Sequence, residues 1–280
     1  MENPGFLAAI GAAIAWGTFM VPFKIAKSDK LILFQAVMSV GILASGLILS
    51  VILGYPLRPN IYGFVAGILW AAANSIALTA IFNLGLSRAA PLVSSLVVIS
   101  SFLWGALVFG EMPAGMIMGF AGIVLIVLGV ILSSATGNLE GQNAKQGLFA
   151  AVAAGLIFGS QLVPLKVGNV STGDFFLSVS LGIFITAMMM AMVRKIRFST
   201  EVLKEGLISG AIWNIGNLLS LISLSLIGLS KMGPISQTAT LVAVFWGLFY
   251  FKEITKPKAK LQVLTGAVIL LGGVIILGLA

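Results

Sequence analysis

Apolar segments long enough to cross a lipid bilayer follow one another along nearly the whole chain of 280 residues. A helix needs about 20 mostly apolar residues to span the hydrocarbon region. Hydrophobic residues make up 59% of the chain and charged residues 9%, whereas soluble domains are roughly one-quarter charged. The alternating pattern of a transmembrane β-barrel is absent from the sequence. We therefore predict an all-α polytopic membrane protein.

Charged residues, prolines and glycines interrupt these segments and place ten transmembrane helices. The predicted spans are 5–26, 31–54, 61–85, 89–110, 115–134, 147–167, 173–193, 206–229, 232–251 and 258–279. The longest polar stretch, Ser133–Gly147, lies near the middle of the chain. These positions predict a first five-helix repeat at residues 1–134, a linker at 135–146 and a second five-helix repeat at 147–280.

The two halves share a sequence pattern at a nearly constant offset. The phrase WGTFMVPFK at Trp16–Lys24 returns as FGSQLVPLK at Phe158–Lys166, 142 positions later (166 − 24). Further segments match at an offset of 142 or 143: Gly67–Asn74 with Gly210–Asn217, Gly85–Pro91 with Gly228–Pro234, and Trp104–Glu111 with Trp246–Glu253. Because each half has an odd number of spans, the second half enters the membrane from the opposite face. The pattern predicts inverted repeats, a construction common in secondary transporters.

The positive charges predict how the helices are oriented. Of the 16 Lys and Arg residues, 13 fall at one set of predicted helix ends and three, Arg58, Lys166 and Lys231, at the other. The richer side is expected to be cytoplasmic, which places both termini outside the plasma (inner) membrane. The net charge of +8 is distributed between helices and forms no basic face, so we expect contact with anionic lipid headgroups and no nucleic-acid partner.

The composition also restricts the chemistry. The chain has no cysteine and no histidine, so it offers neither thiolate nor imidazole for catalysis or metal binding. Its eight acidic residues fall almost entirely at predicted helix ends. We therefore expect no enzyme activity, no metal site and no cofactor. A membrane enzyme is disfavoured, and a binding protein without transport would show saturable ligand binding but no counterflow.

Polar side chains in mid-span are the candidates for a substrate site, because burying them in hydrocarbon without a partner is unfavourable. Trp70 and Asn74 lie four residues apart on one helix face, and Trp213 and Asn217 repeat this spacing. An aromatic ring covers the C–H face of a neutral polyhydroxy ligand, while an amide both donates and accepts hydrogen bonds. Packing and interhelical hydrogen bonding are the alternative roles. Other candidates are Thr18, Gln35, Ser94, Gln161 and Gln237.

The repeated phrase supplies candidate gates. Pro22 and Pro164 can kink or end their helices, and Lys24 and Lys166 can reach the headgroups. These residues can simply end their spans, or the Gly-to-Pro segment can act as a hinge at each mouth of one pathway. Trp104 and Trp246, near helix ends, are expected at the membrane–water interface. Glu111 and Glu253 are expected to cap the helix that follows each of them.

These motifs resemble those of a known transporter group. Ten spans in two inverted halves resemble the drug/metabolite transporter superfamily. More narrowly, Trp16–Lys24, Phe158–Lys166, Ser171–Phe176 and the segments GAIWNIGN and GLSKMGPISQ resemble the glucose/ribose porter family. The resemblance implies uptake of a sugar coupled to protons, without specifying the sugar.

Taken together, the residues and the resemblance favour a secondary active transporter for a small neutral solute. Monosaccharide uptake by alternating access is the leading hypothesis, with proton coupling left open because no mid-span Asp or Glu identifies a carrier. Trp70, Asn74, Trp213, Asn217 and Gln237 would line the site. The alternative is an exporter of amino acids or other metabolites from the same superfamily. The oligomeric state is not predicted.

Overall fold

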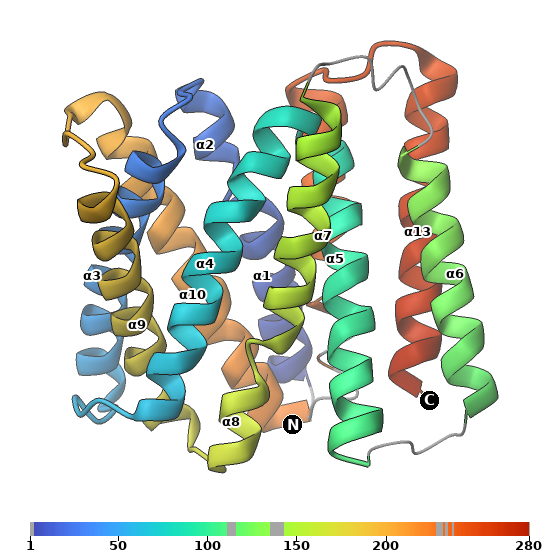
Figure 1. Ribbon diagram of the computed structural model, residues 1–280. Coiled ribbons are helices and arrows are strands. Elements are labelled where there is room, and N and C mark those ends of the chain that lie inside the picture. The colour runs from blue at the N-terminus through green and yellow to red at the C-terminus, as the bar shows by residue number, and fades with distance from the viewer. Residues whose placement is uncertain are drawn as a thin grey trace.

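Helices dominate the structure, a computed structural model that describes residues 3–110, 116–134, 143–227, 232, 235–236 and 238–279 (Figure 1). Turns and loops join these helices. Their bounds are α1 Asn3–Thr18, α2 Val21–Ala26, α3 Leu31–Leu53, α4 Ile61–Leu84, α5 Leu86–Leu103, η1 Trp104–Val108, α6 Met116–Ser134, α7 Ala144–Ser160, α8 Val163–Gly168, α9 Thr172–Val193, η2 Thr200–Val202, α10 Leu203–Ile227, α12 Ala239–Phe245, η3 Trp246–Tyr250 and α13 Pro257–Leu279.

Among the described residues, seven helical segments are long and apolar enough to cross a membrane. Three shorter apolar helices, at Leu86–Ser101, Ile117–Ser133 and Ala239–Tyr250, lie where further spans were predicted. The predicted helical, membrane-spanning character is confirmed, and the ten spans match this set loosely. Within the predicted linker, residues 135–142 lie outside the described part of the chain, and α7 begins at Ala144, three residues before the predicted boundary.

Two of the predicted spans are broken helices. α1 ends at Thr18 and α2 begins at Val21, while α7 ends at Ser160 and α8 begins at Val163. Each short helix has its proline among its first two residues. A proline has no N–H and its ring clashes with the carbonyl four residues earlier, so the helix cannot continue through it unchanged.

Carbonyl groups at these breaks bind serine hydroxyls of other helices. The Ser209 hydroxyl donates to the Phe19 carbonyl at 2.5 Å, and the Ser101 hydroxyl donates to the Gly159 carbonyl at 3.0 Å. In a membrane interior, backbone polar groups released from a helix need such partners. The breaks are thus compatible with a membrane-spanning bundle.

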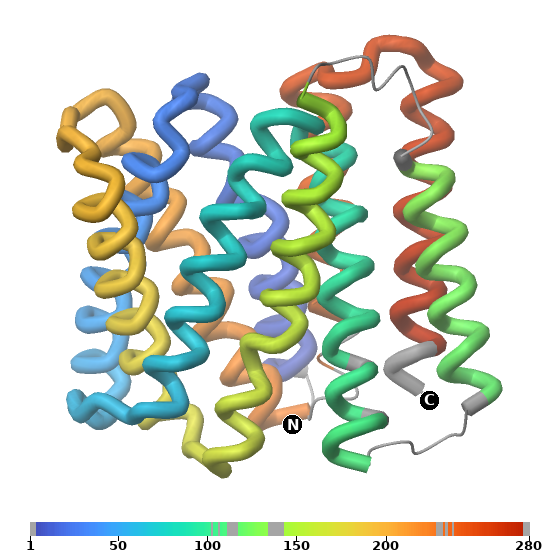
Figure 2. Tube along the Cα trace, in the orientation of Figure 1, coloured from blue at the N-terminus to red at the C-terminus, as the bar shows by residue number. Residues whose placement is uncertain are grey.

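The helices pack in matched pairs from the two halves. α4 packs against α7 and α9, and α10 packs in the same way against α1 and α3. α5 contacts α7 as α12 contacts α1, and α6 lies along α13. α2 and α8 lie at opposite ends of the bundle, and both labelled termini lie at the α8 end (Figures 1 and 2). α4 and α10 are therefore each packed against two helices of the other half.

Glycines allow the closest of these helix crossings. A Cβ added at Gly210 on α10 would overlap the Met38 carbonyl oxygen and lie 2.7 Å from the amide nitrogen of Ile42 on α3. Gly67 on α4 is equally tight against the backbone of α9. Backbone atoms cannot rotate away as a side chain can, so small residues are required there.

We expect Gly210→Ala to destabilise the protein by about 1–3 kcal/mol, because the added methyl must push α3 and α10 apart. Thermal unfolding in detergent measures the change. Gly272→Ala is the matched control, since a Cβ at this position on α13 meets no atom of a described residue within 4 Å. Equal melting temperatures for the two variants would contradict this packing.

Candidate substrate-binding region

Two tryptophans meet at the centre of the bundle, one from each half. The ring centroids of Trp70 on α4 and Trp213 on α10 are 4.3 Å apart, with planes inclined by 49°. Both side chains are buried, with exposed fractions of 3% and 4%. Phe158 on α7 and Phe19 extend the cluster, with centroids 5.9 and 6.5 Å from Trp70. The predicted aromatic residues are thus brought together.

Asn74 faces a second amide. Its Nδ2 donates to Oε1 of Gln35 on α3 at 2.5 Å, and both side chains have an exposed fraction of 0%. Asn74 Oδ1 and Gln35 Nε2 have no hydrogen-bond partner among the described residues. Leaving a buried polar atom unpaired costs about 1–3 kcal/mol. The amide pair therefore retains one free acceptor and one free donor inside the bundle.

The two neighbouring asparagines of α10 differ in their contacts. Asn214 Nδ2 donates to the Ile42 carbonyl at 3.0 Å and to the Ser45 hydroxyl at 3.2 Å, so Asn214 joins α10 to α3. Asn217, one turn beyond Trp213, is buried, and its Nδ2 has no hydrogen-bond partner in the part of the chain that the structure describes. Asn217 therefore has a free amide donor near the aromatic pair, as its counterpart Asn74 has a free acceptor.

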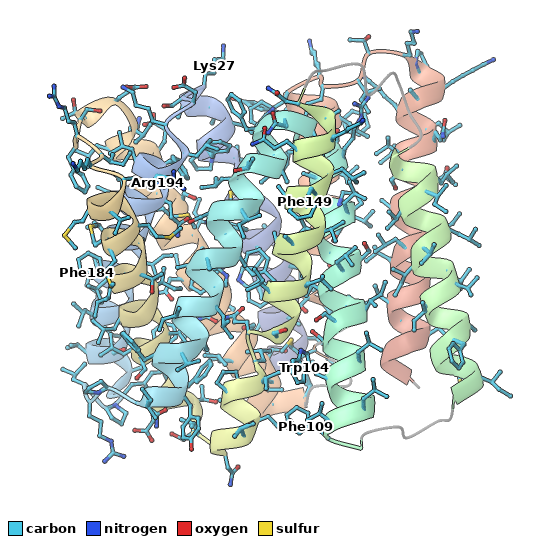
Figure 3. All side chains as sticks on the ribbon, in the orientation of Figure 1. Lys27, Trp104, Phe109, Phe149, Phe184 and Arg194 are labelled. Carbon is cyan, nitrogen blue, oxygen red and sulfur yellow. The ribbon has the colours of Figure 1, made fainter. Side chains whose placement is uncertain are left out.

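Thr18 lies at the first helix break and is held by η3. Trp246 Nε1 donates to its hydroxyl at 3.1 Å, and at the corresponding break Trp104 Nε1 donates to Ser160 at 2.8 Å. These indoles therefore tie helices together at the breaks, a role that the prediction of interfacial tryptophans missed. Figure 3 shows Trp104 toward the α8 end of the bundle.

The remaining predicted binding residues lie elsewhere. Gln161 follows α7 at its break from α8 and is half-buried, while Gln237 lies outside the described residues. The sequence analysis names Gln35 as a further candidate but not among the residues expected to line the site. A signal for it is present in the sequence, because it is a glutamine within an otherwise apolar segment of α3, LILFQAVM.

Glu253 joins the two halves of the chain at the α2 end of the bundle. Its carboxylate accepts hydrogen bonds from the backbone N–H groups of Leu86 and Ser87 at 2.7 and 2.8 Å and from the Ser87 hydroxyl at 2.6 Å. It also pairs with Lys24 Nζ at 3.0 Å. Glu253 therefore caps α5 in the other half, so the prediction that it caps the following helix is wrong.

The α8 end differs from the α2 end. Val21, Pro22 and Phe23 of α2 are buried, whereas no residue of α8 is.

The lysines of the repeated phrase both lie over an aromatic ring. Lys24 Nζ is 5.6 Å from the ring centroid of Phe251, and Lys166 Nζ at the other end is 4.6 Å from that of Phe109. Glu111, the counterpart of Glu253, lies outside the described residues. Pro164 is half-buried in α8, whereas Pro22 is buried in α2. The gate residues thus occupy corresponding positions but differ in burial.

The Glu253 contacts predict a flat pH response at the α2 end. Burial raises the pKa of Glu253, but hydrogen bonds from Ser87 and the charge of Lys24 outweigh it, so the pKa lies below its ordinary value of 4.5. A carboxylate with a lowered pKa stabilises these contacts above pH 4.5 and loses that effect as pH falls through the lowered pKa.

We expect the labelling rate of a cysteine placed at Val21 to stay constant between about pH 8 and pH 5. The rate is normalised to that of a cysteine at exposed Thr200, which corrects for the reactivity of the thiol. A rise in the normalised rate near pH 6.5 would show that a group other than this carboxylate controls the α2 end.

Comparison with known proteins agrees with this architecture. A protein of Bacillus anthracis named "Putative sugar uptake protein" is 25% identical over 98% of this chain and 99% of its own. "Glucose uptake protein GlcU" of Bacillus subtilis is 23% identical over 86% of this chain and 88% of its own. A solved structure at 19% identity has the same fold, with a TM-score of 0.62 over 97% of both chains. The family described as "Sugar transport protein" matches residues 7–280, which confirms the resemblance, and the chain belongs to this family.

Proposed function

We propose that the protein takes up a monosaccharide by alternating access between two inverted five-helix halves. The sugar would bind where α4 and α10 meet, at Trp70 and Trp213, with Gln35, Asn74 and Asn217 as hydrogen-bonding partners. The observation that carries the proposal is this aromatic pair beside buried amides with free donors and acceptors.

A neutral polyhydroxy ligand fits these groups. A sugar hydroxyl both donates and accepts, so one vicinal diol can occupy Asn74 Oδ1 and Gln35 Nε2 together. The apolar C–H face of the ring suits an indole. The three ion pairs between described residues, Lys24–Glu253, Lys30–Glu201 and Arg58–Asp174, all lie near helix ends, which favours an uncharged substrate at the centre.

The matched helix contacts support the inverted arrangement of the halves. Exchanging the two halves converts the packing of α4 on α7 and α9 into that of α10 on α1 and α3. Inverted repeats of this kind open alternately to the two faces of a membrane around a site at their interface. The contacts of Glu253 at the α2 end and the lack of a buried residue in α8 support this cycle, in which the α2 end would be closed in one of the two states.

Uptake of labelled glucose, ribose and rhamnose into cells lacking their own sugar carriers tests the proposal, with an amino-acid mixture as control. Saturable uptake of a sugar supports the proposal, and loss of that uptake with a protonophore would show that uptake is coupled to protons. Reduced accumulation of an amino acid without sugar uptake would instead assign the protein to the exporters.

A further inference from the structure

We propose that the chain binds an anionic phospholipid at the end of α9, with its phosphate among the cations that follow α9 and an acyl chain in a groove formed by α3, α4 and α9. This site lies outside the proposed sugar site, so neither proposal depends on the other. Two adjoining hollows carry this inference, one with several basic residues in its lining and one apolar.

The first hollow has a basic lining. It encloses about 660 Å³ between the loop before α3 and the loop after α9, and Lys30, Lys195 and Arg197 line it together with Asp29. Lys30 is paired with Glu201, whereas Lys195 and Arg197 form no ion pair with a described residue. Three cations against two acids leave a net charge of +1 (3 − 2). The hollow therefore suits a singly charged phosphate diester.

The second hollow is an apolar groove of about 400 Å³ beside the first. Ile32 lines both hollows. Ile68, Met189 and Val193 line the groove with exposed fractions of 37%, 55% and 78%. Arg194 also lines this groove and directly precedes Lys195 in the chain. Arg194 is thus a fourth cation, at the place where the two hollows join.

The position of this junction favours a lipid over a free phosphate. The groove is lined mainly by the candidate spans Leu31–Leu53, Ile61–Leu84 and Thr172–Val193, and the first hollow by the first turn of α3 and the loops beyond these spans. Figure 3 shows Arg194 toward the same end of the bundle as Lys27. A free phosphate would leave the groove unused, whereas a phospholipid places its phosphate and an acyl chain in the two hollows together.

Native mass spectrometry of the full chain, released from detergent with equal amounts of dioleoyl phosphatidylglycerol and dioleoyl phosphatidylcholine, tests this site. We expect the protein to retain phosphatidylglycerol preferentially. Each cation near a lipid headgroup contributes about fivefold in affinity, so Arg194→Gln, Lys195→Gln and Arg197→Gln together should reduce its retention more than tenfold.

A matched control changes the same amount of charge at the same end of the bundle. Lys256→Gln, Lys258→Gln and Lys260→Gln together, at the start of α13, should leave the preference intact. Val193→Gln should weaken retention of both lipids, because it places a polar side chain in the apolar groove that holds the acyl chain and leaves the charge unchanged. Equal loss in the two triple variants, or complete displacement of phosphatidylglycerol by an equal concentration of glycerol 3-phosphate, would overturn the proposal.

Discussion

Replacing Gln35 with Met and Asn74 with Leu in one variant is expected to reduce sugar uptake strongly while leaving the protein stable. The two amides bond each other at 2.5 Å and each keeps an unpaired polar atom, so the wild-type core carries a desolvation cost. Removing both partners of a buried hydrogen bond and replacing them with apolar groups of similar shape is close to neutral for stability. A sugar hydroxyl would then find no partner, which lowers uptake at least about tenfold. Labelled-sugar uptake and the melting temperature, measured on one preparation, test this separation.

The control for this variant is Asn83→Leu, also on α4. The Asn83 amide donates to the Thr79 carbonyl of its own helix at 2.8 Å, so we expect uptake to be retained. A purely structural role of the Gln35–Asn74 pair predicts the reverse result, a lowered melting temperature with uptake per folded molecule unchanged. Normal uptake by a variant carrying both Asn74→Ala and Asn217→Ala would show that these asparagines do not bind the sugar.

Glu253→Ala is expected to open the α2 end. The substitution removes the caps on the Leu86 and Ser87 N–H groups and leaves Lys24 without its carboxylate. Hydrogen bonds to a charged group contribute about 1.5–3 kcal/mol, so the equilibrium between closed and open states should shift by about ten- to hundredfold. The maleimide labelling rate of a cysteine at Val21 should rise accordingly, and uptake should fall because the closed state is depopulated.

Glu201→Ala provides the comparison for Glu253→Ala. Glu201 pairs with Lys30 at the same end of the protein, but the two side chains are 42% and 51% exposed. Exposed ion pairs contribute about 0–1 kcal/mol, so labelling at Val21 should change little. If both variants raise labelling equally, general loss of charge explains the effect and Glu253 does not act as a specific closure.

Local sequence patterns predicted the features that depend on one helix. Apolar length placed the seven long candidate spans of the described residues, and the four-residue spacing put Trp70 and Asn74 on one face. The prolines of the repeated phrase marked the regions where the helices break. In each case the physical cause lies within a few neighbouring residues, so the sequence alone carries the information.

Features that join distant helices could not be predicted in this way. Asn74 meets Gln35 across 39 positions, and Glu253 caps Leu86 across 167 positions. The sequence identified Glu253 as a capping residue but not its target, because the nearest helix start in the sequence belongs to α13 and the nearest in space to α5. The different burial of α2 and α8 also escapes the sequence, since nearly identical phrases encode both helices.

Labelling of cysteines at Val21 and Val163 by a membrane-impermeant maleimide, applied from each side of oriented vesicles, tests the central claim most directly. The chain has no native cysteine, so each substitution introduces the only thiol. Alternating access predicts that Glu253→Ala raises labelling at Val21 and lowers it at Val163, and that the transported sugar changes the ratio of the two rates. Labelling that rises at both positions together, or a ratio unaffected by sugar, would contradict a carrier that opens its two ends in turn.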